Sequence, residues 1–230
     1  MASDQVKLLG TWWSPYVLRI KVPLKLKSVD YEFVEVQLQP PRSEVLLQLN
    51  PIYKKIPVLV HNDNPICESL IILQYIDDVW NTSDSSFFPN DPYDRAMNRF
   101  WAVYIDDKIF PMVRALSAAA GEGVGKEAIH DLVEAVFPLE DVFKNCSKGG
   151  KFFGGDRIGF LDIVLGSFVA WFKAIEVFND VKLFDEVKFP NLSHWIDDFA
   201  VDEAVRDVLP STDKFVEFAK VFFKKITQTN

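Results

Sequence analysis

The sequence predicts two parts, an α/β domain followed by a domain made only of helices. Strand and helix patterns alternate through residues 1–82 in the order βαβαββα, which is typical of a small sheet with helices on its faces. Residues 83–92 are mostly polar and interrupted by prolines, and we interpret them as a linker. From residue 93 to residue 230 the apolar patterns have helical spacing, so the second domain is predicted to be all-α.

The first domain begins with an apolar strand at 6–12 and a helix that opens at Ser14, with a proline in its first turn. Residues 20–27 alternate like a strand. They contain Pro23 and leave no room for a crossover connection, so we interpret them as the rest of a kinked helix. The remaining elements are a strand at 31–38, a helix at 43–49, a hairpin of strands 56–60 and 65–67, and a helix at 68–80.

The second domain carries helical periodicity at 93–120, 126–145, 161–179, 192–199 and 213–227. Its longest apolar stretch, residues 161–178, is interrupted by Asp162, Lys173 and Glu176. These charges favour a buried helix over a membrane span.

Composition and charge exclude several classes of protein. Of the 230 residues, 49% are hydrophobic and 25% are charged, which excludes a disordered chain. A net charge of −8 and a pI near 5.0 argue against a nucleic-acid partner, because phosphate binding needs a basic surface. Cys67 and Cys146 form no CxxC pair, and residues 1–5 carry no apolar signal core. We therefore expect a cytosolic protein without a disulfide framework and without a membrane partner.

Neither a metal site nor an acid/base pair is expected. The histidines lack ligand spacing; they are His61, His130 and His194. Three pairs of acids are adjacent, and neighbours on a helix point about 100° apart, so we interpret them as solvated faces. The pairs are Asp77-Asp78, Asp106-Asp107 and Asp197-Asp198. Cys67 is interpreted as a packed residue rather than a nucleophile.

Ser14 stands where the first strand ends and the first helix begins. The unpaired N–H groups and partial positive charge of a helix start attract anions. In a redox protein of this topology a reactive cysteine would occupy this turn. A serine hydroxyl cannot exchange disulfides, but it can donate a hydrogen bond to the thiolate of a substrate. The alternative is that Ser14 is only an N-cap, the preferred use of serine there.

Two more polar clusters stand at strand ends. Lys54 and Lys55 precede Ile56-Pro57, where a cis bond would hold the Ile56 backbone open to a peptide-like ligand; the alternative is an edge-strand proline beside solvated lysines. Glu68 and Ser69 open the next helix, where they can bind an ammonium and a carboxylate or only cap the helix. Together with Ser14, these clusters suit a short peptide that carries carboxylates and an amine.

Separated segments resemble, in order and spacing, the cytosolic glutathione transferases, and most of all the plant tau class. The segments are Trp12-Trp13-Ser14-Pro15-Tyr16, residues 50–59, Pro65-Ile66-Cys67-Glu68-Ser69, Gln74-Tyr75-Ile76-Asp77, Phe100-Trp101-Ala102 and Phe153-Gly154-Gly155-Asp156. The resemblance implies a thioredoxin-like N-terminal domain, an all-helical C-terminal domain and a homodimer. It also implies conjugation of glutathione to hydrophobic electrophiles in detoxification and the stress response, with glutathione as co-substrate, no cofactor and some peroxidase activity.

The resemblance further implies the roles of the residues at the glutathione site. Ser14 would hydrogen-bond the glutathione sulfur and favour its thiolate. Lys55 would hold the glycine carboxylate, the backbone of Ile56 before Pro57 the cysteinyl amide, and Glu68 with Ser69 the γ-glutamyl end. The family's other lysine falls on Arg42, after one extra proline in Pro40-Pro41, and a guanidinium does not bind a carboxylate as an ammonium does.

The electrophile would lie between the domains, in an apolar pocket with few polar groups. The wall residues implied by the resemblance are Tyr16, Phe110, Arg114, Ser117, Trp171, Phe218 and Phe222. Each aromatic residue can instead be plain core packing, and the small Ser117 would widen the pocket. Pro23 replaces the family's alanine and is expected to bend the first helix without loss of the site. Asp162 matches an acid that we interpret as a cap and folding determinant.

Two other functions stay open at this point. A non-catalytic carrier would use the same cavity to bind hydrophobic ligands without chemistry. A thiol transferase or dehydroascorbate reductase would need cysteine at position 14, where this sequence has serine. The glutathione motifs are intact except at Arg42, which favours the transferase.

Overall fold

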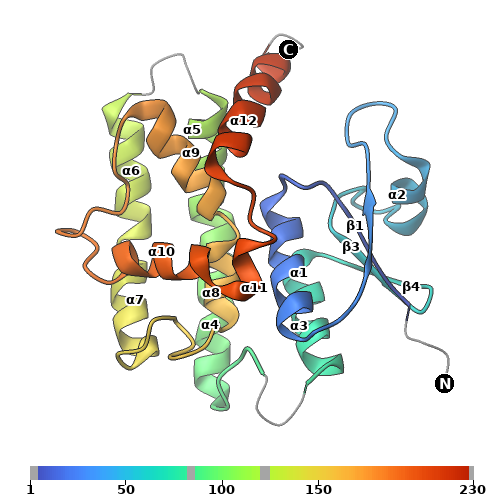
Figure 1. Cartoon of the computed structure of the whole chain (residues 1–230), viewed down its shortest axis with the longest axis horizontal. Helices are drawn as coiled ribbons and strands as arrows, with labels where there is room; N and C mark the ends of the chain where they lie inside the picture. The colour runs from blue at the N-terminus through green and yellow to red at the C-terminus, as the bar shows by residue number, and fades with distance from the viewer. Residues whose placement is uncertain (1–4, 82–85, 120–124, 228–230) are drawn as a thin grey trace. The chain divides into compact units, whose positions relative to one another are not determined.

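The structure is a computed structural model that describes residues 5–81, 86–119 and 125–227, with side chains described as far as Phe222. The chain divides into two compact units, residues 1–86 and 87–230 (Figure 1). Residues 83–85 of the expected linker and residue 120 at the end of an expected helix lie outside the described residues.

The first unit has the predicted element order βαβαββα. Its elements are β1 (Val6–Gly10), α1 (Pro15–Leu26), β2 (Glu32–Glu35), α2 (Glu44–Leu49), β3 (Val58–His61), β4 (Asn64–Cys67) and α3 (Ser69–Val79). The helix interpretation of residues 20–27 is confirmed, since α1 continues through Pro23. β1 ends two residues before the predicted strand does, because Thr11 already accepts a turn hydrogen bond from the Ser14 N–H.

The four strands form one mixed sheet in the order β2-β1-β3-β4. β1 runs parallel to β2 and antiparallel to β3, and β3 runs antiparallel to β4. Figure 1 shows α1 and α3 on one side of this sheet and α2 on the other. Because side chains alternate along a strand, Leu9, Val58 and Val60 share one face, where they pack with Leu46 of α2. This is a thioredoxin-like arrangement.

A buried ion pair joins the end of α1 to α3. The Nζ of Lys27 lies 3.0 Å from the Oδ1 of Asp77, and their side chains are only 2% and 4% exposed. Ser86 donates a hydrogen bond of 2.8 Å to the Oδ2 of Asp77. The interpretation of Asp77 as part of a solvated face is therefore wrong, because the helix turns Asp77 inward and only Asp78 outward. Removing one partner of such a pair costs about 3–5 kcal/mol.

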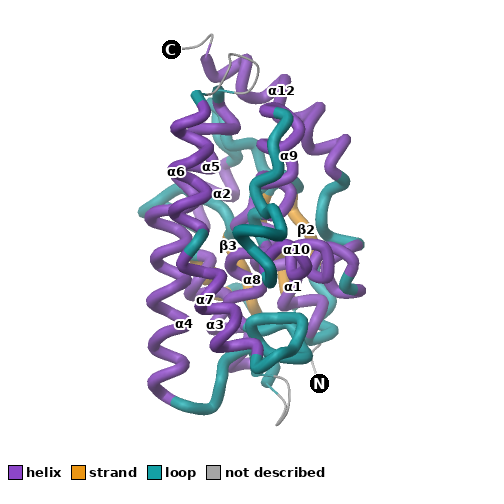
Figure 2. Tube along the Cα trace, turned by 90° about the vertical axis from the view of Figure 1, so that its left-hand side faces the viewer, coloured by secondary structure: helices purple, strands orange, loops and turns teal. Residues whose placement is uncertain are grey.

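The second unit is all-helical, as predicted, and among the described residues only the first unit contains strands (Figure 2). Its elements are α4 (Pro92–Tyr104), the π-helical segment η1 (Ile105–Ile109), α5 (Phe110–Ala118), α6 (Lys126–Val136), α7 (Pro138–Ser147), α8 (Phe160–Gly166), α9 (Val169–Asn179), α10 (Leu192–Val201), α11 (Glu203–Arg206) and α12 (Thr212–Thr227). The predicted helix at 126–145 is divided because Pro138 begins a new helix. No helix of the described ranges is both long and apolar enough to cross a membrane.

A buried carboxylate, that of Asp162, holds the start of α8. It accepts hydrogen bonds from the backbone N–H groups of Phe153, Gly154 and Gly159 at 2.8–3.0 Å, and from the indole N–H of Trp195 at 2.7 Å. Asp162 therefore caps α8, as interpreted from the sequence, and ties it to the preceding loop and to α10. Burial raises the pKa of Asp162 to about 6, although its four donors favour the ionised form.

Asp162 gives the stability of the fold a pH dependence of defined sign. Because folding raises the pKa from 3.8 to about 6, the folded chain holds the proton more tightly, and stability falls as the pH rises through this interval. Asp162→Asn cannot titrate at this position. We expect the free energy of unfolding of the parent, relative to Asp162→Asn, to fall by up to about 3 kcal/mol between pH 4 and pH 6 in urea denaturation. A difference that is independent of pH would contradict this.

Candidate functional site

The register of the sheet gathers the predicted polar clusters of the first unit at one end. Leu9 near the end of β1 pairs with Val58 at the start of β3, and Val58 pairs with Cys67 at the end of β4. The connection that follows β1, the one that precedes β3 and the one that follows β4 therefore all lie at the same end of the sheet. The clusters on these three connections are Ser14, Ile56-Pro57 and Glu68-Ser69.

Ser14 is the N-cap of α1, with extended backbone angles and Pro15 at the first helical position. Its Oγ accepts a hydrogen bond of 3.4 Å from the Val17 N–H, and the side chain is almost fully buried. Capping uses the oxygen of the hydroxyl as an acceptor, whereas stabilising a thiolate uses its proton as a donor. The two interpretations of Ser14 are therefore compatible.

The segment before β3 is held by Asn50, which the sequence reasoning did not single out as a site residue. The Asn50 side chain donates to the Lys55 carbonyl at 2.9 Å and accepts from the Tyr53 N–H at 3.1 Å. The Ile56–Pro57 bond is cis, as the sequence suggested. Asn50 is 3% exposed, whereas Lys55 is exposed, so a buried amide fixes the loop that presents an exposed cation.

Arg42 lies exposed on the loop after β2, which leaves the sheet at the same end, since Gly10 pairs with Glu35. Its Nε donates to the Leu38 carbonyl at 3.1 Å, and its Nη1 donates to the Lys54 carbonyl at 3.2 Å. Arg42 therefore fastens its own loop to the turn that carries the lysines.

Glu68 and Ser69 lie at the start of α3. Glu68 is exposed and occupies the N-cap position with φ 68° and ψ 116°, and its carboxylate makes no capping hydrogen bond. The capping alternative is thus not realised by the Glu68 side chain. A non-glycine residue held in such a conformation costs about 1–3 kcal/mol, which often indicates a functional constraint. Ser69 is buried and accepts a hydrogen bond of 3.1 Å from the Nη1 of Arg19, a residue that sequence reasoning missed.

The two thiols are poor nucleophiles. Burial and the charge of Glu68 raise the pKa of the Cys67 thiol. Burial and two acidic neighbours, Asp94 and Asp162, raise the pKa of the Cys146 thiol. Since the thiolate is the reactive form, neither cysteine is suited to attack a substrate at neutral pH.

In the second unit, several of the predicted wall residues form one aromatic run. Ring centroids lie 6.0 Å apart for Phe110 and Trp171, 5.2 Å for Trp171 and Phe215, 6.2 Å for Phe215 and Phe218, and 5.1 Å for Phe218 and Phe222. Phe215, which links α12 to Trp171, was not among the predicted residues. The helical spacing of the phenylalanines in α12 is the sequence signal that could have found it.

The polar residues of the predicted wall differ in their exposure to solvent. Arg114 is exposed on α5. Ser117, three residues further, is completely buried, and its hydroxyl has no hydrogen-bond partner among the described residues. Tyr16 belongs to the first unit, where it is half-buried on α1 and its ring lies against Arg19.

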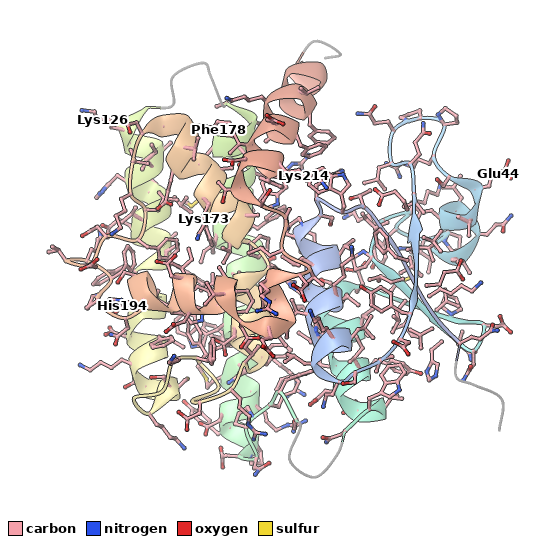
Figure 3. All side chains as sticks on the ribbon, in the orientation of Figure 1. Glu44, Lys126, Lys173, Phe178, His194 and Lys214 are labelled. Carbon is pink, nitrogen blue, oxygen red and sulfur yellow. The ribbon has the colours of Figure 1, made fainter. Side chains whose placement is uncertain are left out.

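A groove of about 500 Å³ lies away from the predicted wall residues, between α9 and α10. Lys173 and His194, both labelled in Figure 3, line it. The Nζ of Lys173 lies 3.3 Å from the Oδ1 of Asp197, so this carboxylate partly offsets the positive charge of Lys173. None of the residues that the sequence analysis predicted for the electrophile lines this groove.

Comparison with known proteins agrees with the family resemblance over nearly the whole chain. Residues 4–78 match the family described as glutathione S-transferase, N-terminal domain, and residues 105–198 match glutathione S-transferase, C-terminal domain. Glutathione S-transferase U17 of Arabidopsis thaliana is 51% identical over 225 residues, which are 98% of this chain and 99% of that protein.

Two solved structures of high similarity are also plant proteins. The tau class glutathione S-transferase of mango, Mangifera indica, is 47% identical with a TM-score of 0.86, covering 96% of this chain and 99% of the mango chain. Rice GST1, solved in complex with glutathione, is 32% identical with a TM-score of 0.85, covering 98% of this chain and 99% of its own. The resemblance found in the sequence is therefore confirmed. The chain belongs to the tau class of the glutathione S-transferase family and is a glutathione transferase.

Proposed function

We propose that Ser14 is the catalytic residue of this transferase and that its hydroxyl donates a hydrogen bond to the glutathione sulfur. The observation that carries this proposal is the geometry at the start of α1, where the Ser14 oxygen accepts from the Val17 N–H and the hydroxyl proton is left for an anion. A thiol with an ordinary pKa of about 8.5 is only a few per cent thiolate at pH 7. A hydrogen bond to the charged sulfur, at about 1.5–3 kcal/mol, lowers that pKa by roughly one to two units.

The tripeptide is held, in this proposal, along the end of the sheet where the three clusters meet. Lys55, with Arg42 as a second cation, binds the glycine carboxylate, and the Ile56 backbone pairs with the cysteinyl amide. Glu68 binds the γ-glutamyl ammonium, and Ser69 binds its carboxylate at the positive end of α3. The register of β1, β3 and β4 supports this assignment, because one extended peptide can reach all three connections.

The bound thiolate attacks an electrophilic carbon, a carbon–sulfur bond forms, and the leaving group departs with its electron pair. The same thiolate can attack the terminal oxygen of a hydroperoxide; the O–O bond breaks, an alkoxide leaves and takes a proton, and glutathione sulfenic acid forms. A second glutathione reduces this sulfenic acid, which yields glutathione disulfide and water and gives the transferase its proposed peroxidase side activity. The aromatic run from Phe110 to Phe222 supports a broad class of hydrophobic acceptors, since apolar walls select little beyond size and shape. We place this activity in detoxification in the cytosol, where Cys67 and Cys146 would stay as free thiols, as they are in the structure.

Replacing Ser14 by alanine tests the catalytic role. We expect Ser14→Ala to lower kcat/KM for conjugation of glutathione to a chlorodinitrobenzene-type acceptor by about 10- to 150-fold, the equivalent of one hydrogen bond to a charged group. The pH at which the rate rises should move up by about one to two units. The initial rate is measured from pH 5.5 to pH 9.

The matched control is Asp91→Ala. Asp91 caps α4 in the same way, also followed by a proline, and accepts from the Tyr93 and Asp94 N–H groups. Loss of this cap costs stability of about 0.5–2 kcal/mol and should leave the pH–rate profile in place. Unchanged conjugation rates in Ser14→Ala would contradict the proposed mechanism. A parent that binds glutathione and hydrophobic ligands without any turnover would be the carrier instead.

We also propose that the protein is a homodimer. Three apolar residues on one face of α4 are exposed in the single chain: Tyr93 at 71%, Phe100 at 55% and Val103 at 50%. Their spacing of seven and three residues places them together on the helix surface. In the first unit, Ile71 and Val79 of α3, eight residues apart, are likewise exposed. Apolar surface of this kind marks an interaction site, and a second copy is the partner that the tau class resemblance implies.

Phe100→Glu places a charge in the proposed dimer contact. We expect the parent to sediment at twice the 26.3 kDa chain mass at micromolar concentration, and Phe100→Glu to shift toward the mass of one chain. Val177→Glu on α9, where the valine is equally exposed at 56%, is the control and should stay dimeric. A monomeric parent, or equal dissociation of both variants, would remove the support for this contact.

A further inference from the structure

The groove of about 500 Å³ between α9 and α10 of the second unit has no role in the proposed function. Two of its lining residues, Lys173 on α9 and His194 on α10, are labelled in Figure 3. A volume of this size lies within the range of about 300–1,000 Å³ that is typical of sites for small molecules. The side chains that line the groove therefore indicate which kind of molecule it suits.

The charges around the groove are negative in sum. Four carboxylates and two ammonium groups line it, which gives a formal charge of −2 with His194 counted as neutral. Both ammonium groups already have a carboxylate nearby. Lys173 is paired with Asp197, as described above. The Nζ of Lys182 lies 3.6 Å from the Oε1 of Glu186. An anion would meet paired cations and a surplus of negative charge, so the groove favours a cation.

The other two carboxylates, Glu176 and Asp180, are four residues apart at the end of α9 and lie on one face of the helix. Glu176 has a structural partner, since its Oε1 accepts a hydrogen bond of 2.8 Å from the Leu183 N–H. Asp180 is exposed, and its carboxylate has no hydrogen bond or ion pair among the described residues. Asp180 is therefore the carboxylate that is left for a ligand.

Apolar side chains and a buried hydroxyl complete the lining of the groove. Val177, three residues before Asp180, is 56% exposed. Phe184 and Ile196 are buried beside it. Ser193 is only 7% exposed, and its hydroxyl has no hydrogen-bond partner in the described part of the chain. Buried hydroxyls are rarely left without a partner, because this costs free energy. Since Ser193 is a lining residue, the groove is the place from which a partner can come.

We propose that this groove is a second binding site, separate from the glutathione site, for amphipathic amines, in which an ammonium group is joined to an apolar body with a further hydrogen-bonding group. The ammonium pairs with the Asp180 carboxylate. The apolar body covers Val177, which lies on the same face of α9. The further polar group of the ligand hydrogen-bonds the Ser193 hydroxyl.

Two probes of nearly equal shape and opposite charge test the ligand class. Tyramine carries an ammonium and a phenol, and 3-(4-hydroxyphenyl)propionate carries a carboxylate in place of the ammonium. We expect tyramine to bind the parent with a Kd of about 1 mM, and the acid to bind at least about 10-fold more weakly. Binding is measured by titration calorimetry at pH 7.5. Saturating S-hexylglutathione is present throughout, so that the proposed glutathione and acceptor sites are filled.

Asp180→Asn removes the charge without straining the backbone. Asp180 ends α9 in a left-handed conformation, φ 50° and ψ 50°, which asparagine also adopts. We expect this variant to bind tyramine about 3- to 5-fold more weakly, as for loss of a partly exposed ion pair. The matched control is Asp63→Asn, the same change at another exposed residue with positive φ, in the hairpin turn of the first unit. It should bind tyramine like the parent.

Ser193→Ala tests the buried hydroxyl. We expect it to weaken tyramine binding by about 3- to 10-fold, as for loss of one neutral hydrogen bond, and to leave the unfolding temperature close to that of the parent, since the hydroxyl has no partner in the protein. Ser147→Ala is the control, because Ser147 is a buried serine of α7 that does not line the groove. Its affinity for tyramine should equal that of the parent.

Each outcome decides the inference. Equal affinity for the amine and the acid overturns it, and so does the absence of binding. Tyramine binding that S-hexylglutathione abolishes would place the probe in the acceptor site and also overturns it. Parent-like affinity in Asp180→Asn or in Ser193→Ala would show that the probe binds elsewhere. Conjugation of glutathione is measured separately, so failure of this inference leaves the proposed function standing.

Discussion

The proposed glutathione site depends on the register between β1, β3 and β4. Leu9 opposite Val58 and Val58 opposite Cys67 set which connections leave the sheet at one end. A slip of one residue would turn every side chain of a strand to the other face. Here both faces are covered, by α2 on one side and by α1 and α3 on the other, so a slipped register would lose apolar burial on each. Apolar packing in the core thus fixes the spacing of the polar groups that lie on the strand connections.

The hydroxyl groups of the two serines at this end of the sheet have the same hydrogen-bonding arrangement. Each oxygen accepts a hydrogen bond from the protein, Ser14 from the Val17 N–H and Ser69 from Arg19, so each proton is available to a ligand. The consequences differ because the ligand groups differ. In the proposed site the ligand group of Ser14 is a thiol, which titrates near neutral pH, so a donor there would change the fraction that is reactive. The proposed ligand group of Ser69 is a carboxylate, which is ionised throughout that range, so a donor there would change binding only.

Much of this site could be predicted because its signals are local. Ser14 before a proline and Ile56-Pro57 before a strand are readable within a few residues, and alternating patterns give the element order. Arg19 and Asp77 could not be predicted, because a charged residue on a helix is expected to face solvent. Each of these side chains is buried together with a hydrogen-bonding or ionic partner from another part of the fold. No local sequence pattern identifies that partner. The role of Asn50 could not be predicted either, since its hydrogen bonds depend on the shape of the loop.

The second unit shows the same division between local signals and long-range packing. The cap at Asp162 follows from its place near a helix start, whereas its bond from Trp195 on α10 needs the tertiary fold. In the proposed acceptor site, the aromatic rings that contact one another through Trp171 and Phe215 would bind by non-directional dispersion and would tolerate acceptors of varied shape. The polar groups of the first unit require one ligand with fixed donors and acceptors. In this proposal, substitutions in the helices would change the range of acceptors, while the strand connections would keep the chemistry of the thiolate constant.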